Sequence, residues 1–259
     1  MKTSLVTVSM VAISSAIPSL HAEYSAEASL GYQNLDSNFS GEDLYLAGFS
    51  IYTSPLDYLG KTPYDEAAFF NQVGQVDLQY GLATGFGDDI NTYGLAYTHQ
   101  NRNSDHGFSA SWFTTDVLDN FNAYEAGYHY FLDQGFSVGA EVALADFDSG
   151  HAWSYALNSK RLFSFENDRW LTLEGGFGWA NDGSEGDWSM NVLATYYPTQ
   201  RTGLGIGTTT TDRLSDYNTV FSATHYLKPN FAVNVSYNRD FIKNASDADG
   251  ISFGGKLRF

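Results

Sequence analysis

The sequence has 259 residues, of which 30 are acidic and 13 are basic, and its formal net charge is −17. A chain this acidic lacks the basic surface that nucleic-acid binding requires. It contains no cysteine, so disulfides and thiolate metal sites are excluded. Aromatic residues make up 16% of the chain. After the N-terminal segment, no stretch approaches the roughly 20 consecutive apolar residues of a membrane-spanning helix.

The N-terminus has the three parts of a secretory signal peptide. Lys2 supplies a short positive region, residues 5–17 are largely apolar, and Ala22 is a small residue at an acceptable cleavage site. The apolar part is too short and too interrupted for a membrane anchor. We therefore expect residues 1–22 to be removed and residues 23–259 to form the mature protein.

The first and last segments of the mature chain, residues 23–33 and 250–259, alternate with a period of two, which is typical of β-strands. In the last segment, one face carries Ile251, Phe253, Leu257 and Phe259, and the other carries Ser252, Gly254, Lys256 and Arg258. Matching patterns at the two ends of the chain indicate a sheet that closes on itself. A terminal Phe after such a strand also resembles the signature of Gram-negative outer-membrane barrels, which implies recognition of this strand by the barrel insertion machinery.

Between these two segments the sequence predicts twelve more strands. They are expected at 43–53, 75–82, 92–97, 108–112, 124–130, 136–144, 153–165, 170–179, 188–197, 202–211, 217–227 and 231–239. Every second connection is a short turn, as on the periplasmic side of such barrels, and an even strand count keeps both termini there. The predicted fold is an all-β, antiparallel, up-and-down transmembrane β-barrel of 14 strands. The alternative is 12 strands, if the second strand or the segment around Leu204 fails to pair.

Residues 54–72 form the longest irregular segment. Pro63, followed by acidic residues, favours a helical turn over Tyr64–Phe70, because proline suits a first helical position and acidic residues suit the first turn. The adjacent Phe69 and Phe70 carry apolar surface that should be buried. We expect a structured element that lies at the periplasmic rim or enters the lumen, where it would narrow the pore.

The region Ala47–Tyr80 resembles a family of small porins from Gram-negative bacteria. The likeness rests on two strands, the proline-containing connection between them and the run Glu66-Ala67-Ala68-Phe69. Elsewhere it rests on the signal peptide, the turns and the terminal Phe. The resemblance implies an outer-membrane barrel with channel activity, but it carries over no substrate and no functional residues.

The polar faces of the predicted strands contain more acidic than basic residues. The pore-lining candidates are Glu27, Asp77, Glu125, Glu141, Glu174, Lys160, Lys256 and Arg258. The longer outer connections are also acidic, opposed only by Arg213, Arg239 and Lys243. A negative field at a channel mouth attracts cations, although acidic loops could instead keep the surface soluble and bind divalent ions beside lipopolysaccharide. The residues contain no nucleophile motif, phosphate loop or metal-ligand cluster, so we expect no catalytic site, metal or cofactor.

Fourteen strands about 4.8 Å apart and tilted by about 40° enclose a lumen that side chains cannot fill. We therefore predict a passive, cation-preferring channel for small hydrophilic solutes in the outer membrane, surrounded by lipid and lipopolysaccharide. The alternative is a non-conducting structural or adhesion barrel in which the outer loops carry the function.

Two details should follow from this arrangement. The first is a pair of aromatic belts on the exterior, because Tyr and Trp prefer the membrane–water interface. The outer belt should contain Tyr32, Tyr80, Tyr93, Trp112, Trp153, Trp179, Trp188 and Tyr237, and the periplasmic belt Tyr130, Phe136, Phe165, Tyr196, Phe231 and Phe259. The second is a seam at which Glu23 and Glu27 approach Lys256 and Arg258 in water, where each pair contributes only ~0.2–1 kcal/mol.

Overall fold

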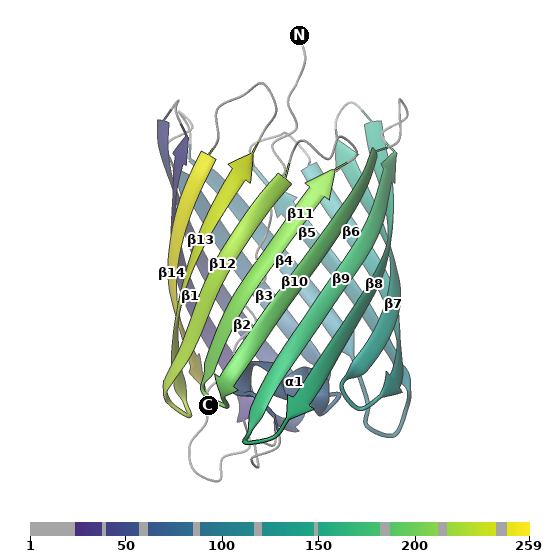
Figure 1. Ribbon diagram of the computed structural model, residues 1–259. Coiled ribbons are helices and arrows are strands. Elements are labelled where there is room, and N and C mark those ends of the chain that lie inside the picture. Colours follow the sequence, from purple (N-terminus) through teal and green to yellow (C-terminus); the bar gives the residue numbers. More distant parts are fainter. Residues whose placement is uncertain are drawn as a thin grey trace.

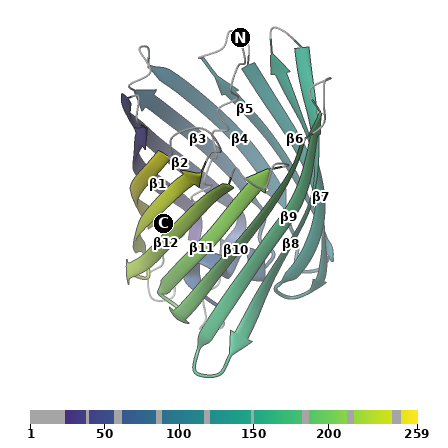
Figure 2. The same cartoon turned by 45° about the horizontal axis from the view of Figure 1, so that its top comes forward.

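The structure is a computed structural model that describes residues 24–37, 40–56, 62–84, 89–116, 121–147, 150–181, 187–211, 217–241 and 248–259. The expected signal peptide and Glu23 lie outside these ranges. Within them the chain forms one closed antiparallel barrel (Figure 1). Figure 2 turns one end of the barrel forward and shows the strands as a ring.

The barrel has 14 strands, each hydrogen-bonded to its neighbours in sequence. They are β1 (Tyr24–Ser37), β2 (Ser40–Leu56), β3 (Gln75–Thr84), β4 (Ile90–His99), β5 (His106–Thr115), β6 (Phe121–Asp133), β7 (Phe136–Phe147), β8 (Gly150–Phe165), β9 (Arg169–Asn181), β10 (Asp187–Thr199), β11 (Thr202–Thr211), β12 (Tyr217–Lys228), β13 (Phe231–Phe241) and β14 (Ala248–Arg258). The prediction of 14 strands is confirmed. The 12-strand alternative is wrong, because β2 and β11 each pair on both sides.

The first and last strands close the barrel, as their patterns predicted. Glu27 lies opposite Arg258, and Ser29 lies opposite Lys256. The register of β1 against β2 shifts by an irregularity between Tyr24 and Ala26. We call the end that holds the start of β1 and the end of β14 the periplasmic end, following the rule for barrels with an even number of strands. Figure 1 shows this end at the bottom, with the short turns.

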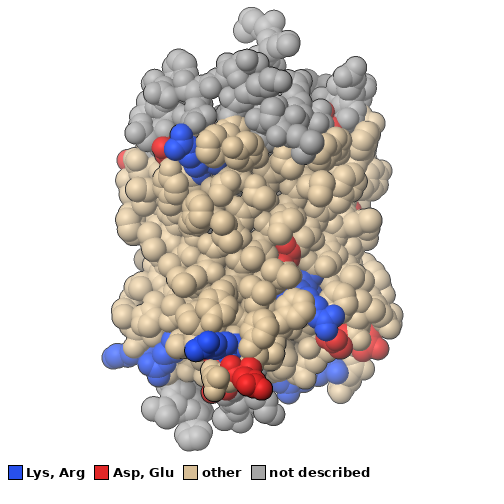
Figure 3. Space-filling view, in the orientation of Figure 1, with Lys and Arg blue, Asp and Glu red and all other residues tan. Residues whose placement is uncertain are grey.

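The exterior of the barrel is apolar around its circumference, because successive side chains of a strand point to opposite faces. Leu30, Leu157 and Phe253, on three different strands, expose 69%, 64% and 56% of their surface. A belt of such side chains in water would carry a large free-energy cost, whereas lipid removes it. On the face shown in Figure 3, the middle of the barrel surface is almost free of charged side chains.

The predicted aromatic belts lie on this exterior face. The strand register places Tyr80 beside Tyr93 and Trp179 beside Trp188 near the outer end. Phe165, Phe231 and Phe259 lie near the periplasmic end and are exposed. The prediction that the belts face outward is confirmed.

Two short helices, η1 (Tyr64–Glu66) and α1 (Ala67–Phe70), follow β2. No helix in the described part of the chain has the length and apolar character needed to cross a membrane. The label α1 in Figure 1 lies at the periplasmic end, within the outline of the barrel. These helices belong to the segment that positions the candidate site.

Candidate functional site

The segment Thr62–Gly74, which we call the plug, folds into the periplasmic end of the lumen. Pro63, with φ of −57°, precedes the first helical turn, and Gln72, with φ of 51°, reverses the chain after α1. The predicted helical turn over Tyr64–Phe70 is confirmed. The predicted start of the irregular segment at residue 54 is wrong, because β2 continues to Leu56.

Glu66 of the plug makes one ion pair and two hydrogen bonds to the barrel wall. Its carboxylate lies 3.0 Å from Lys160 Nζ on β8, and it accepts hydrogen bonds from the Thr172 and Tyr197 hydroxyls at 3.0 and 2.9 Å. Only 4% of Glu66 is exposed. A charged group can be buried to this degree when it is paired and its remaining lone pairs accept hydrogen bonds. Lys160 also contacts Glu174 on β9 at 2.9 Å.

The preceding residues of the plug are bound by the opposite wall. Asp65 lies 3.6 Å from Lys256 Nζ on β14 and accepts a hydrogen bond of 2.6 Å from the Tyr226 hydroxyl on β12. The Tyr64 ring packs edge-on against Tyr226, with 5.2 Å between ring centroids. The plug is therefore bound by both walls of the lumen at once.

The aromatic residues of α1 anchor the plug to the same part of the wall that binds Glu66. Phe69 and Phe70 pack against a buried cluster of Leu162, Trp170 and Tyr197. Lys160 Nζ lies 4.9 Å from the centre of the Phe69 ring. Both phenylalanines are partly buried, so the expectation that their apolar surface is covered is confirmed in part.

The seam between β1 and β14 differs from its prediction in one respect. Arg258 Nε donates a hydrogen bond of 3.2 Å to Glu27, and the Tyr52 hydroxyl donates one of 2.9 Å to the same oxygen. Glu27 and Arg258 are 2% and 3% exposed, so the expectation of a water-facing pair is wrong. The plug lies over the seam, and Arg258 also donates to the Tyr64 carbonyl oxygen at 3.4 Å.

The eight pore-lining candidates all lie on strand positions that face the lumen, but the structure divides them into two groups. Glu27, Glu174, Lys160, Lys256 and Arg258 contact the plug or one another at the periplasmic end. The other three lie elsewhere on the wall, without an ion pair among the described residues. These three residues are Asp77, Glu125 and Glu141. Asp77 accepts hydrogen bonds from Ser50 and Gln75, and Glu141 accepts one from Asn158.

Sequence reasoning missed several residues of the site. Tyr52, Trp170, Tyr197 and Tyr226 point inward near the periplasmic ends of their strands, and each is at least 92% buried. Most other inward positions are small or polar. Large aromatic residues on the polar face of a strand were therefore the available sign that something fills the lumen at this level.

The outer rim is described only in part. Many acidic residues of the predicted outer loops, among them Asp88, Asp182 and Asp216, lie outside the described ranges. At the end of β5, Asp116 accepts hydrogen bonds from the side chain and the backbone amide of Asn91, both 2.6 Å long. These bonds hold the pKa of the Asp116 carboxyl below its usual range, so this carboxylate is negative at neutral pH.

Together, the closed antiparallel ring, the apolar exterior and the polar lumen define a transmembrane β-barrel of the outer-membrane type. The outer-membrane protein Omp33 of Acinetobacter baumannii has a similar structure, with a TM-score of 0.71 and 19% sequence identity over 92% of this chain and 99% of that one. A bacterial polysaccharide outer-membrane secretin covers the same shares of the two chains with a TM-score of 0.51 and 10% identity. No protein-family model and no curated protein sequence matches this chain. These likenesses show a shared fold.

Proposed function

We propose that this protein is an outer-membrane channel of the porin type, closed at its periplasmic mouth by the plug. Small hydrophilic solutes would diffuse through it passively once the plug leaves its seat. The observation that carries the proposal is the contrast between the two parts of the lumen. The periplasmic mouth holds a plug bound by both walls, whereas the wall above it carries small inward residues such as Gly139, Gly176 and Ser236.

The width of the barrel supports the same conclusion. Fourteen strands spaced by about 4.8 Å and tilted by about 40° give a backbone diameter of roughly 28 Å. Small side chains cannot fill such a lumen, so water occupies it above the plug. The plug is then the element that sets whether the two sides of the membrane communicate.

We also propose that the open channel prefers cations. Each basic residue that lines the described lumen is bound to a carboxylate: Lys160 to Glu66 and Glu174, Lys256 to Asp65, and Arg258 to Glu27. Asp77, Glu125 and Glu141 are carboxylic acids with no basic partner among the described residues. Unpaired negative charge inside a low-dielectric wall concentrates cations.

Conductance across a planar lipid bilayer tests these proposals. Deleting residues 59–68 should raise the single-channel conductance, because it removes both carboxylates that bind the walls. In a KCl gradient, the reversal potential of the deletion variant should have the sign of a cation-selective pore. An anion-selective reversal potential would contradict the cation preference while leaving the channel function in place.

The tightly bound plug also favours a second candidate function, a non-conducting structural or adhesion barrel. In that case the plug would be a permanent stabilising element, and the outer loops would carry the structural or adhesion function. The deletion separates the two functions. A folded deletion variant that does not conduct would support the structural barrel and overturn the channel.

On either proposal we expect lipid and lipopolysaccharide around the exterior, and recognition of the final strand by the barrel insertion machinery.

A further inference from the structure

The barrel wall has a notch at its periplasmic edge, between β2 and β4. The intervening strand, β3, begins at Gln75, which pairs with Tyr52 of β2 and Thr98 of β4. Residues 53–56 of β2 therefore extend beyond the start of β3. Part of the gap is filled by the end of the plug, where the Thr53 amide donates a hydrogen bond of 2.8 Å to the Gly74 carbonyl oxygen.

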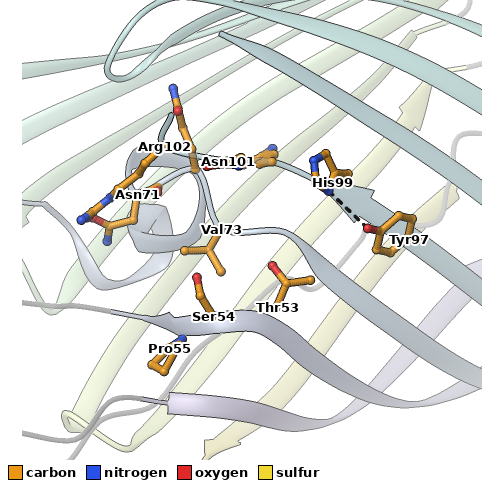
Figure 4. A pocket seen from close by; sticks show the side chains of 11 residues that line it. Thr53, Ser54, Pro55, Asn71, Val73, Tyr97, His99, Asn101 and Arg102 are labelled. Carbon is orange, nitrogen blue, oxygen red and sulfur yellow. Dashed lines mark hydrogen bonds between the residues drawn. The ribbon is translucent and has the colours of Figure 1, made fainter. Parts of the chain in front are cut away.

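A cavity of about 470 Å³ remains in this notch. Figure 4 shows Thr53, Ser54 and Pro55 on one side of the cavity, with Tyr97 and His99 on another. Asn71 and Arg102 lie beside each other at a third edge. The cavity thus joins the wall of the barrel, the end of the plug and the connection that follows β4.

The cavity lies where the lipid-facing surface ends. Outward positions on β4 are occupied by Leu95, Tyr97 and then His99, so this row passes from apolar to polar and its last two members line the cavity. The outward row of β2 changes in the same way, from Ile51 to Thr53. A lipid whose acyl chains cover these rows would place its headgroup at the notch.

The chemistry of the cavity suits an anion. None of its 11 lining residues is acidic, in a chain with 30 acidic residues, and Arg102 is the lining residue with a permanent charge. The Arg102 guanidinium is held in place by hydrogen bonds to Asn71, one of 3.1 Å to the carbonyl oxygen and one to the side-chain oxygen. Hydroxyl and amide groups, which can donate hydrogen bonds, make up most of the remaining lining.

Basic side chains also occur on the periplasmic rim away from the notch. On the face shown in Figure 3, Lys and Arg side chains lie along this rim, together with some acidic ones, at the level of phospholipid headgroups. Exposed basic residues occur in this rim on the tight turns, including Arg169, Arg201 and Lys228. Arginine is well suited to phosphate because its planar guanidinium can donate two parallel hydrogen bonds to phosphate oxygens.

We propose that this notch is a binding site for the phosphate-bearing headgroup of one phospholipid in the periplasmic leaflet, with Arg102 as the residue that binds the phosphate. The acyl chains lie along the outward faces of β2, β3 and β4. The headgroup then rests against Asn71, at the end of the plug. This inference does not depend on whether the barrel conducts.

Native mass spectrometry of the delipidated, detergent-solubilised mature protein tests the proposal. The protein is titrated with phosphatidylglycerol, with diacylglycerol of the same acyl chains, and with inorganic phosphate. We expect one molecule of phosphatidylglycerol to bind at a lower lipid concentration than any further molecules do. Arg102→Gln should weaken this binding by about tenfold, because it removes a charge-assisted contact. The control Arg169→Gln removes a rim charge outside the notch and should bind as the unmodified protein does.

Ser54→Asp supplies a second variant, because it adds a carboxylate to the cavity without altering the contact between Arg102 and Asn71. It should weaken phosphatidylglycerol binding as well. Equal binding of diacylglycerol would show that acyl chains alone are recognised and would overturn the proposal. So would inorganic phosphate that binds the notch while the lipid does not, or unchanged lipid binding in Ser54→Asp and Arg102→Gln.

Discussion

Lys160 and Lys256 lie on nearly opposite walls of the barrel and bind two consecutive carboxylates of the plug. They belong to β8 and β14, which are six strands apart in a ring of 14. Lys160 binds Glu66 at 3.0 Å, and Lys256 binds Asp65 at 3.6 Å. The peptide unit that joins Asp65 to Glu66 is therefore held between the two walls. Loss of either lysine should free one side of the plug.

Lys160→Met should increase the conductance of the channel strongly. It leaves the carboxylate of Glu66 buried without a cation, although the Thr172 and Tyr197 hydroxyls still donate to it. Breaking a buried pair in this way costs about 3 kcal/mol, which corresponds to roughly a hundredfold higher population of the displaced plug. Single-channel recordings measure this population as open probability. Lys228→Met, on an exposed turn of the same rim, is the matched control and should behave as the unmodified protein.

Trp170 should report displacement of the plug by its fluorescence. It is 3% exposed and packs in the cluster that receives Phe69 and Phe70. The other four tryptophans lie on the lipid face, so a variant that keeps Trp170 alone gives a signal from this site. We expect little quenching by aqueous iodide in that variant, and clearly more when Glu66→Gln is added. Equal quenching in the two proteins would show that the plug stays seated without the ion pair.

Glu125 and Glu141 should account for much of the cation preference that we propose for the unplugged channel. They lie on adjacent strands and face the lumen, and neither contacts a basic side chain in the described part of the chain. In the variant lacking residues 59–68, the double substitution Glu125→Gln and Glu141→Gln should move the potassium-to-chloride permeability ratio toward one. Asp133→Asn, at an exposed periplasmic turn, is the control. If the double substitution leaves the permeability ratio of the deletion variant unchanged, other residues determine the selectivity.

Arg258→Met should destabilise the barrel more than an exposed cation would. It removes the cation that lies against the buried Glu27 carboxylate, to which the Tyr52 hydroxyl still donates, at a cost of about 3–5 kcal/mol. Arg239→Met removes a pair with Asp249 that is 41% and 47% exposed, where a loss of ~0–1 kcal/mol is expected. The stabilities of the two variants are compared by heating each protein in SDS and recording the temperature at which its band shifts from the folded to the unfolded position on the gel. Adding Glu27→Gln to Arg258→Met should restore part of the loss, because the buried charge is then gone.

The sequence alone determined the strand pattern, and the reason is that strand alternation is local. Each side chain points to the face opposite its neighbour's, so the placement of Leu157 toward lipid and Lys160 toward the lumen follows from parity within one strand. The helical turn after Pro63 is local in the same sense, since it depends on the proline and the acidic residues that follow it.

Only the tertiary structure decided what these residues contact. Lys160 is 94 positions from Glu66 in the sequence, and Arg258 is 231 from Glu27, so both pairs exist only because the ring closes and the plug enters it. The same closure turns a pair expected in water into a buried one. The notch beside Arg102 arises because β3 begins at the level of Tyr52, short of the level at which β2 ends. Such relationships depend on register and closure, which periodicity does not encode.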